Sequence, residues 1–279
     1  MSRSAPRVGD RTDGPGVPTW GCFDPYSVDV VVTGRAGGVS RGPYESLNLG
    51  LHVGDDAERV VENRRRAAAA VGLGLDGMVF CHQTHGREVA VVGPDDRGRG
   101  TLAVADAVRA DAVVTTTPDV GLAVMVADCV PIVLYDPDAH VVAAVHAGWR
   151  GTVARVTDAA LETMAGLGTR PRDVIAGVGP AITADRYQVG EDVVDAARDC
   201  FDGATSGIVR PDGTGRWTFD LWAANRRLLV EAGVPEGNIE VTAVGTGPGT
   251  PFFSDRAARP CGRFAALARL HARPSGTGR

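Results

Sequence analysis

Four short apolar runs lie close together between residues 111 and 147, and they restrict the possible folds more than any other feature of the chain. They read DAVVTT (111–116), GLAVMVA (121–127), PIVLYD (131–136) and HVVAAVHA (140–147), with tight breaks at Gly, Pro and Asp. Runs this rich in β-branched residues are typical of strands. Their close spacing predicts a mixed β-sheet rather than a strict alternation of strands and helices.

The rest of the chain alternates apolar runs with amphipathic segments. Further strands are expected at 28–34, 77–86, 173–180 and 239–244. Helices are expected at 55–72, 152–168, 190–201, 219–233 and 262–272. The pattern predicts an α/β fold in a single domain over residues 20–272. Because 1–19 and 273–279 are rich in Gly, Pro, Ser and Arg, we expect a disordered N-terminal segment and a flexible tail.

The composition limits the classes of partner. The chain has 279 residues, 44% hydrophobic and 23% charged, which is typical of a soluble globular protein with a full core. A formal net charge of −5 gives no general attraction to nucleic acid or an anionic membrane, so small substrates are favoured. All 29 basic residues are arginine, which excludes Schiff-base chemistry and a phosphate-loop lysine. Any anion must be held by arginine or by backbone N–H groups.

The five cysteines are scattered and odd in number. They are Cys22, Cys81, Cys129, Cys200 and Cys261, and none forms a C-x-x-C pair, so the sequence predicts neither a disulfide framework nor a zinc ribbon. The first 20 residues lack the apolar core of a signal peptide, and no later stretch is apolar for long enough to span a membrane. We therefore expect a cytoplasmic protein.

Three side chains of metal-ligand type stand where predicted strands end. They are His85 in CHQTHG, Cys129 in ADCVP and His146 in VHAGWRG. Sites in open α/β sheets assemble where strand ends bring loops together, so these residues could meet. Two imidazoles and a thiolate suit zinc, and a three-ligand site leaves one position for water or substrate. Taken singly, each residue is more often an ordinary buried cysteine or a hydrogen-bonded histidine.

Other residues compete with this trio or could support it. His82 is about as plausible a ligand, His52 is less so, and His140 and His271 are expected at the surface. Arg150 could hold a phosphate or carboxylate with its planar guanidinium. Asp128 could orient a ligand imidazole or accept a proton. A surface salt bridge is the alternative for both Arg150 and Asp128.

Several motifs, in order along the chain, resemble those of one family. They are SLNLGLHVGDD (46–56), ENR (62–64), QTHG (83–86), DAVVT (111–115), ADCVPIVLYD (127–136), VHAGWRG (145–151), GPAI (179–182) and FFSDR (252–256). Together they resemble the laccase-domain family, also called the multicopper polyphenol oxidase or purine nucleoside phosphorylase family, which includes a peptidoglycan editing factor. The resemblance covers about residues 28 to 270.

The resemblance implies a fold and a metal site. It implies an αββα sandwich similar to the catalytic domain of cytotoxic necrotizing factor, a cysteine deamidase. It also implies one zinc ion held by His85, Cys129 and His146, the same trio that the strand ends suggested. Asp128 is a further candidate for catalysis.

The resemblance also implies an activity on purine nucleosides. It implies phosphorolysis of adenosine, inosine, guanosine and methylthioadenosine, and hydrolytic deamination of adenosine. The candidates for contacts with the nucleoside or phosphate, by position, are Arg35, Asn48, Gln83, Arg150 and Arg256. Family members usually have Phe-Ser-Tyr-Arg near 252–256 and Thr-Gly-Arg after it. Here Asp255 replaces the aromatic residue, and Cys261-Gly262-Arg263 ends the motif.

Three other functions remain open on the sequence. A histidine, cysteine, histidine set also binds copper, but a multicopper laccase uses about ten histidines and this chain has six, so copper-dependent phenol oxidation ranks lower. A metal-free cysteine hydrolase or amidase acting in peptidoglycan editing would use Cys129 as nucleophile and His146 as base. A non-enzymatic binding protein could keep the same site.

Overall fold

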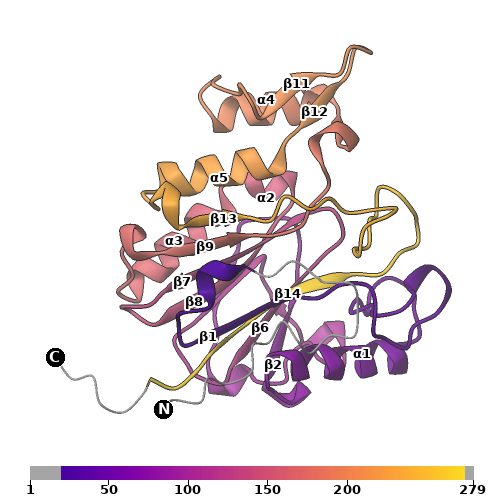
Figure 1. Ribbon diagram of the computed structural model, residues 1–279, viewed down its shortest axis with the longest axis vertical. Coiled ribbons are helices and arrows are strands. Elements are labelled where there is room, and N and C mark those ends of the chain that lie inside the picture. The colour runs from indigo at the N-terminus through magenta and orange to yellow at the C-terminus, as the bar shows by residue number, and fades with distance from the viewer. Residues whose placement is uncertain (1–19, 274–279) are drawn as a thin grey trace.

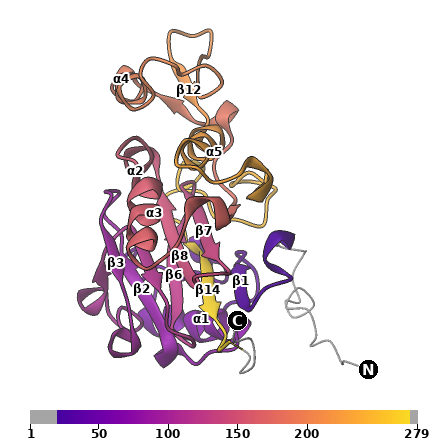
Figure 2. The same ribbon diagram turned by 90° about the vertical axis from the view of Figure 1, so that its left-hand side faces the viewer.

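The computed structural model describes residues 20–273, which form two face-to-face β-sheets with helices on their outer faces (Figures 1 and 2). The five-stranded sheet has the order β1 (Val28–Val32), β14 (Phe264–Leu270), β6 (Gly121–Val126), β2 (Met78–His82) and β4 (Val108–Arg109). The six-stranded sheet has the order β13 (Ile239–Val241), β9 (Ile175–Val178), β7 (Val130–Asp136), β8 (Val141–Ala147), β5 (Ala112–Thr115) and β3 (Val89–Val91). Each sheet mixes parallel and antiparallel pairs, as the sequence predicted.

Five α-helices surround or extend the sheets. They are α1 (Ala57–Ala70), α2 (Trp149–Val153), α3 (Val156–Gly166), α4 (Glu191–Cys200) and α5 (Leu221–Glu231). A small third sheet has the order β10 (Gln188–Val189), β12 (Trp217–Phe219) and β11 (Val209–Pro211). Its strands β11 and β12 lie with α4 beyond α5, at the top of Figure 1. Short 3₁₀ turns occupy Gly21–Phe23, Gly42–Tyr44, Leu75–Gly77, Pro94–Asp96, Val104–Asp106, Pro171–Asp173, Ala184–Arg186 and Glu236–Asn238.

Alternation along the strands builds the layers. In β14, Phe264, Ala266, Ala268 and Leu270 pack between the sheets, and the alternate residues Ala265 and Leu267 pack with α1. In β8, Val142 and Ala144 face the other sheet, and the odd-numbered residues face the helices α3 and α5. The layer order is therefore α1, five-stranded sheet, six-stranded sheet, and α3 with α5. The prediction of a single mixed α/β domain is confirmed.

The predicted helix at 262–272 is wrong, because Phe264–Leu270 forms strand β14. The segment FAALARL combines residues with high helix propensity in an almost continuous apolar run. Such a run does not distinguish a helix from a strand that is buried on both faces. β14 lies between β1 and β6 in the five-stranded sheet, so tertiary packing overrides the local preference.

Two smaller expectations also need correction. The helix expected at 152–168 is two helices, α2 and α3, because Arg155 takes a left-handed conformation with φ of 61° between them. His140 is buried rather than at the surface, with Nδ1 3.2 Å from the Tyr135 hydroxyl and Nε2 2.8 Å from the carbonyl oxygen of His271. His271 is half-buried, and its Nε2 lies 2.9 Å from an Asp29 carboxylate oxygen.

The expected tails lie almost wholly outside the described residues, which end at 273. None of the helices between residues 20 and 273 is both long and apolar enough to cross a membrane.

Candidate metal centre and substrate cavity

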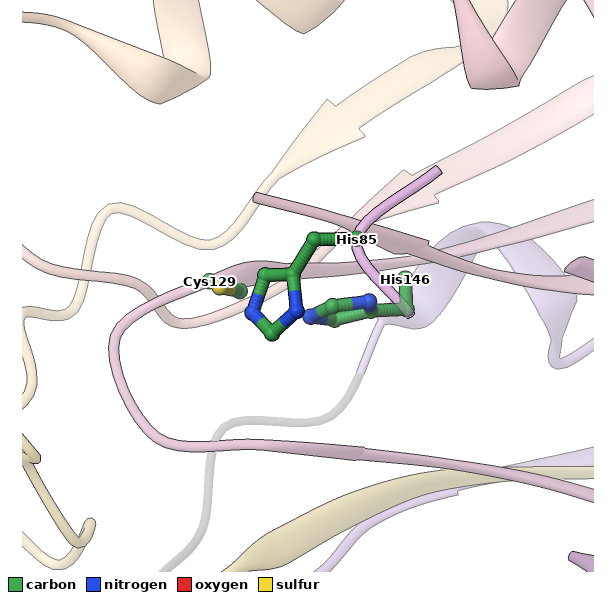
Figure 3. A group of neighbouring side chains, drawn as sticks. All are labelled: His85, Cys129 and His146. Atoms are coloured by element: carbon green, nitrogen blue, oxygen red, sulfur yellow. The ribbon is translucent and has the colours of Figure 1, made fainter. Parts of the chain in front are cut away.

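His85, Cys129 and His146 converge at one end of the sandwich, and their side chains point toward one another (Figure 3). One possible ligand atom from each residue lies within 4.8 Å of the other two. His85 follows β2, Cys129 directly precedes β7, and His146 is near the end of β8. Because β7 and β8 pair antiparallel, with Pro131 opposite His146, the start of one strand brings Cys129 beside the end of the other.

The backbone around the trio is tight and partly strained. His85 and Asp128 both have positive φ, of 60° and 90°. Such values are uncommon for residues other than glycine and persist only where surrounding contacts hold them. A Cβ atom at Gly148 would lie 2.8 Å from Cys129 Sγ and 3.1 Å from His85 Cδ2, so a larger residue there would displace the candidate ligands.

Asp111 connects two of the three candidate ligands. Its carboxylate is fully buried and lies 2.9 Å from His146 Nδ1. The same carboxylate accepts hydrogen bonds from the backbone N–H groups of Thr84, His85 and Gly86, and from the Thr84 hydroxyl. The sequence reasoning placed a carboxylate beside the ligand imidazole but chose Asp128, and the structure gives that contact to Asp111.

The charges of the site reinforce one another. Burial alone would raise the pKa of Cys129, but the neighbouring His146 and His85 lower it from the usual 9.0 to about 6. Burial would lower the pKa of His146, but Cys129 and Asp111 raise it to about 9. Burial opposes ionisation of Asp111 too, and its hydrogen bonds hold its pKa well below the usual value. Each of these three groups therefore favours the charged form of its neighbour.

These residues fit a soft or borderline metal ion. A thiolate and two imidazoles are suitable ligands for zinc or copper, and the lowered pKa of Cys129 favours the ionised form that binds metal. Asp111 occupies Nδ1 of His146, which leaves Nε2 as the nitrogen available to a metal. A carboxylate behind a metal-binding histidine is the usual arrangement for fixing the ring and its tautomer.

The cavity around the trio has a volume of about 580 Å³. It contains all three candidate ligands and four of the other predicted site residues, Gln83, Asp128, Arg150 and Arg256. The alternatives His52 and His82 also line it, although neither joins the trio. Arg35 and Asn48 are not among its lining residues.

Arg150 and Arg256 line this cavity, and the guanidinium group of each stacks on an aromatic ring. The Arg150 guanidinium carbon lies 4.3 Å from the centre of the Trp149 ring, and its side chain makes no hydrogen bond or ion pair to another residue of 20–273. That of Arg256 lies 5.2 Å from the Tyr187 ring centre, and its nitrogens donate to the Gln188 carbonyl oxygen. Both arginines retain donors for an anionic ligand.

The other residues predicted to contact substrate form hydrogen bonds within the protein. The Gln83 side chain exchanges two hydrogen bonds with the Met125 backbone, at 2.7 and 2.8 Å, and so fastens the loop after β2 to β6. Asn48 is fully buried and bonds to Gly50, Asp55 and the backbone of Arg263. Arg35 donates to the Glu45 carbonyl oxygen.

Asp128 uses both carboxylate oxygens on the loop before β14. One oxygen accepts from the Thr246 hydroxyl at 2.5 Å, and the other accepts from the backbone N–H of Arg256 at 2.6 Å. Asp128 therefore fixes the backbone position of Arg256 at the cavity.

The sequence reasoning missed three residues of the site, which are Asp111 behind His146 and two residues of the cavity lining. Asp111 begins the quoted DAVVT motif, and a carboxylate directly before a buried strand is the signal that could have drawn attention to it. Tyr187 and Arg263 also line the cavity. Tyr187 carries no distinctive motif, and Arg263 was quoted only as the end of Cys-Gly-Arg.

Comparisons with known proteins show the family of the chain. A family model described as multi-copper polyphenol oxidoreductase laccase matches residues 29–271. A purine nucleoside phosphorylase of Deinococcus radiodurans is 45% identical over 202 residues, which cover 72% of this chain and 74% of that protein. A protein named adenosine deaminase RL5, from an unknown prokaryotic organism, is 41% identical over 82% of this chain and 88% of its own length. The crystal structure of YlmD from Geobacillus stearothermophilus matches with a TM-score of 0.86 and 36% identity, over 91% of this chain and 94% of that one.

Proposed function

This chain belongs to the multi-copper polyphenol oxidoreductase laccase family, and we propose that it is a zinc-dependent purine nucleoside phosphorylase that also deaminates adenosine. Relatives named purine nucleoside phosphorylase and adenosine deaminase support the two activities. Adenosine, inosine, guanosine and methylthioadenosine are the proposed nucleosides.

The observation that carries the proposal is the meeting of His85, Cys129 and His146 in one cavity with two arginines. Three protein ligands leave a coordination position for a reactant, as in catalytic zinc sites. A zinc ion held there would lower the pKa of water and stabilise developing negative charge. Arg150 and Arg256 supply the donors that an anionic co-substrate needs, which a chain without lysine must provide through arginine.

Each residue then has a task. His85, Cys129 and His146 would hold the metal, and Asp111 holds the His146 ring through Nδ1, which leaves Nε2 available. Arg150 and Arg256 position phosphate for attack at C1′ of the ribose while the purine leaves. The catalytic role expected for Asp128 stays a prediction, and its contacts favour support of Arg256. The contacts of Gln83, Asn48 and Arg35 likewise favour support of the cavity walls over direct contact with substrate.

The direct test is the release of hypoxanthine from inosine, followed by chromatography. We expect free base only when phosphate is present, together with ribose 1-phosphate. Equal release without phosphate would indicate a nucleosidase, and no release would refute phosphorolysis. Cys129→Ala should lose most of the metal and the activity, because a soft ligand is removed. Cys200→Ala, a half-buried cysteine on α4, is the matched control and should keep both.

A metal-free cysteine hydrolase or amidase is a second candidate, favoured by the geometry of Cys129, His146 and Asp111. A nucleophile beside a base that is oriented by a third group is the usual arrangement for nucleophilic catalysis. The expected likeness to the catalytic domain of cytotoxic necrotizing factor stays a prediction, as does a role in peptidoglycan editing. Amide hydrolysis that rises when a chelator removes the metal would favour this candidate, and hydrolysis that falls would exclude it.

Copper-dependent phenol oxidation ranks third. The trio could hold one copper ion, and the family description names copper. The cytoplasmic location and the absence of nucleic-acid and membrane partners expected from the sequence also stay predictions.

A further inference from the structure

The cavity has a second group of basic side chains that the proposed phosphate contacts do not use. His52, Arg64, His82 and Arg263 all line it, and we call them the basic wall. They come from four separate segments: the loop before α1, α1 itself, the end of β2 and the residue before β14. Arg150, by contrast, lies on α2, which Figure 1 shows on the other side of the sheets from α1.

Arg64 is a buried cation without a carboxylate partner among residues 20–273. Its side chain is 1% exposed and stacks on the Phe80 ring at 4.1 Å. Its Nε and Nη1 donate to the carbonyl oxygens of Leu49, Gly100 and Thr101. Nη2 meets only the Met125 sulfur, at 3.5 Å, which is a weak acceptor. A buried charge is costly unless an opposite charge compensates it, so the wall favours an anion nearby.

Arg263 lines the cavity and uses only part of its guanidinium on protein acceptors. Its Nη1 bonds to the carbonyl oxygens of Cys261 and Gly262, and Nη2 bonds to Asp255 at 3.0 Å. Its Nε has no acceptor among the described residues. Asp255 is shared with Arg259, whose nitrogen lies 2.5 Å from the other carboxylate oxygen, so this one carboxylate cannot neutralise both cations.

His52 adds an uncharged donor to the wall. Although His52 is exposed overall, desolvation of its ring and the charges of Arg263 and Arg64 lower its pKa to about 4. His52 is therefore neutral near pH 7 and offers one N–H donor. His82 is exposed at the end of β2.

The charged side chains that line the whole cavity also favour an anionic ligand. Five arginines and two aspartates line it, in a chain whose net charge is −5. Asp255 is paired with two of these arginines, and Asp128 is occupied by Thr246 and the backbone of Arg256. A cavity with this excess of cations attracts ligands with more than one negative charge.

We propose that the basic wall binds an anionic group carried by the organic substrate, so that the enzyme prefers purine nucleoside 5′-monophosphates to the unmodified nucleosides. The purine base and the ribose of this substrate are inferred from the proposed function. Its 5′-phosphate, the second anionic group besides free phosphate, is inferred from the basic wall. Arg150 and Arg256 remain the contacts for free phosphate. A volume of about 580 Å³ is within the usual range for ligand pockets, roughly 300–1,000 Å³.

The test measures binding of inosine and inosine 5′-monophosphate by calorimetry in phosphate-free buffer, with the protein as purified. We expect the monophosphate to bind about ten- to 100-fold more tightly, as one charged hydrogen-bonded contact provides. Arg263→Gln should remove most of this preference and leave inosine affinity unchanged. Arg198→Gln is the matched control, because Arg198 stacks on Trp217 and is not among the lining residues of the cavity, so it should retain the preference. His82→Gln changes an exposed side chain, so it tests the wall even if Arg263→Gln fails to fold, and it should reduce the preference by a smaller factor.

Equal affinities for the two ligands would overturn the proposal, as would an Arg263→Gln variant that weakens both equally. An alternative result is that Arg263→Gln keeps the preference for the monophosphate and shows a raised KM for inorganic phosphate in inosine cleavage. That result would assign the basic wall to the co-substrate phosphate and contradict the proposal. A retained preference in a protein that cleaves no nucleoside would refute the proposed function while supporting the basic wall.

Discussion

Apolar side chains fill the space between the two sheets. The end of the same sheets at the candidate metal centre instead holds buried polar groups and strained backbone. Between the sheets, β6 and β14 contribute Val, Leu, Ala and Phe side chains that are almost completely buried. At the metal-centre end, the buried residues include the carboxylate of Asp111 and the imidazole of His146, and backbone strain occurs at His85 and Asp128. Apolar burial stabilises the first region, and the second uses that stability to hold polar groups in place.

The comparison separates the expected effects of mutations. Changes between the sheets should lower the free energy of unfolding and leave the site's chemistry intact in the protein that remains folded. Changes at the metal-centre end should alter metal binding or a single reaction at small cost in stability. A substitution that lowers the free energy of unfolding and also impairs metal binding in the folded protein would contradict this separation.

His146→Ala should have the largest effect on function. It removes a ligand on which every reaction at the site depends, so phosphorolysis and deamination should be lost together. Metal content and steady-state rates on inosine with phosphate and on adenosine without it measure this. His82→Ala, another histidine in the cavity, is the control and should keep its metal. A fully metallated and active His146→Ala protein would remove His146 from the ligand set.

Leu122→Ala should have the largest effect on stability. Leu122 is fully buried between the sheets on β6, so its truncation should cost about 2–5 kcal/mol in the free energy of unfolding. Denaturant titration measures this cost, and Leu102→Ala is the control because Leu102 is 64% exposed. The folded fraction of Leu122→Ala should still carry its full metal content. Loss of metal from folded protein would show that the two regions are not separable.

Arg150→Ala should affect one reaction and spare the other. Loss of a charged hydrogen bond should cost about 1.5–3 kcal/mol of transition-state stabilisation. The rate of phosphorolysis should then fall roughly ten- to 150-fold, or the phosphate KM should rise by that factor. Adenosine deamination uses water and should change much less. The matched control is Arg198→Ala, since Arg198 stacks on Trp217 and is not among the lining residues of the cavity. An equal loss in both reactions would assign Arg150 a structural role.

Asp111→Asn should weaken metal binding by about ten- to 100-fold, the usual cost of losing a carboxylate behind a ligand histidine. The amide lacks the charge that favours the His146 contact, and its NH₂ group cannot accept from the N–H groups of residues 84–86. Competition with a chelator of known affinity measures the change. Asp136→Asn is the matched control, because Asp136 is also buried but lies at the other end of β7. Equal losses in both variants would indicate general destabilisation.

Local patterns predicted most of the helices and central strands, because amphipathic periodicity and tight breaks report the chain's own geometry. They failed for β14, where burial on both faces hides the strand period, and for His140, whose burial depends on Tyr135 and His271. Both failures involve contacts between segments that are distant in sequence, since β14 pairs with β1 and β6 and His140 bonds to His271.

The candidate site shows the same limit. The ends of predicted strands identified His85, Cys129 and His146, since ligand-type residues stand out beside glycine and proline breaks. The partner of His146 could not be chosen from the sequence, because Asp111 and Asp128 each adjoin a strand and only the pairing of β5 with β8 brings Asp111 to the imidazole. Arg35 and Asn48 matched the family by position, yet neither lines the cavity.

The most direct test of the zinc centre is the metal content of the protein purified without chelator or added metal, measured by elemental analysis. We expect one tightly held zinc ion per chain, lost in Cys129→Ala and retained in Cys200→Ala. Copper in place of zinc, or active protein that contains no metal, would contradict a zinc centre formed by His85, Cys129 and His146.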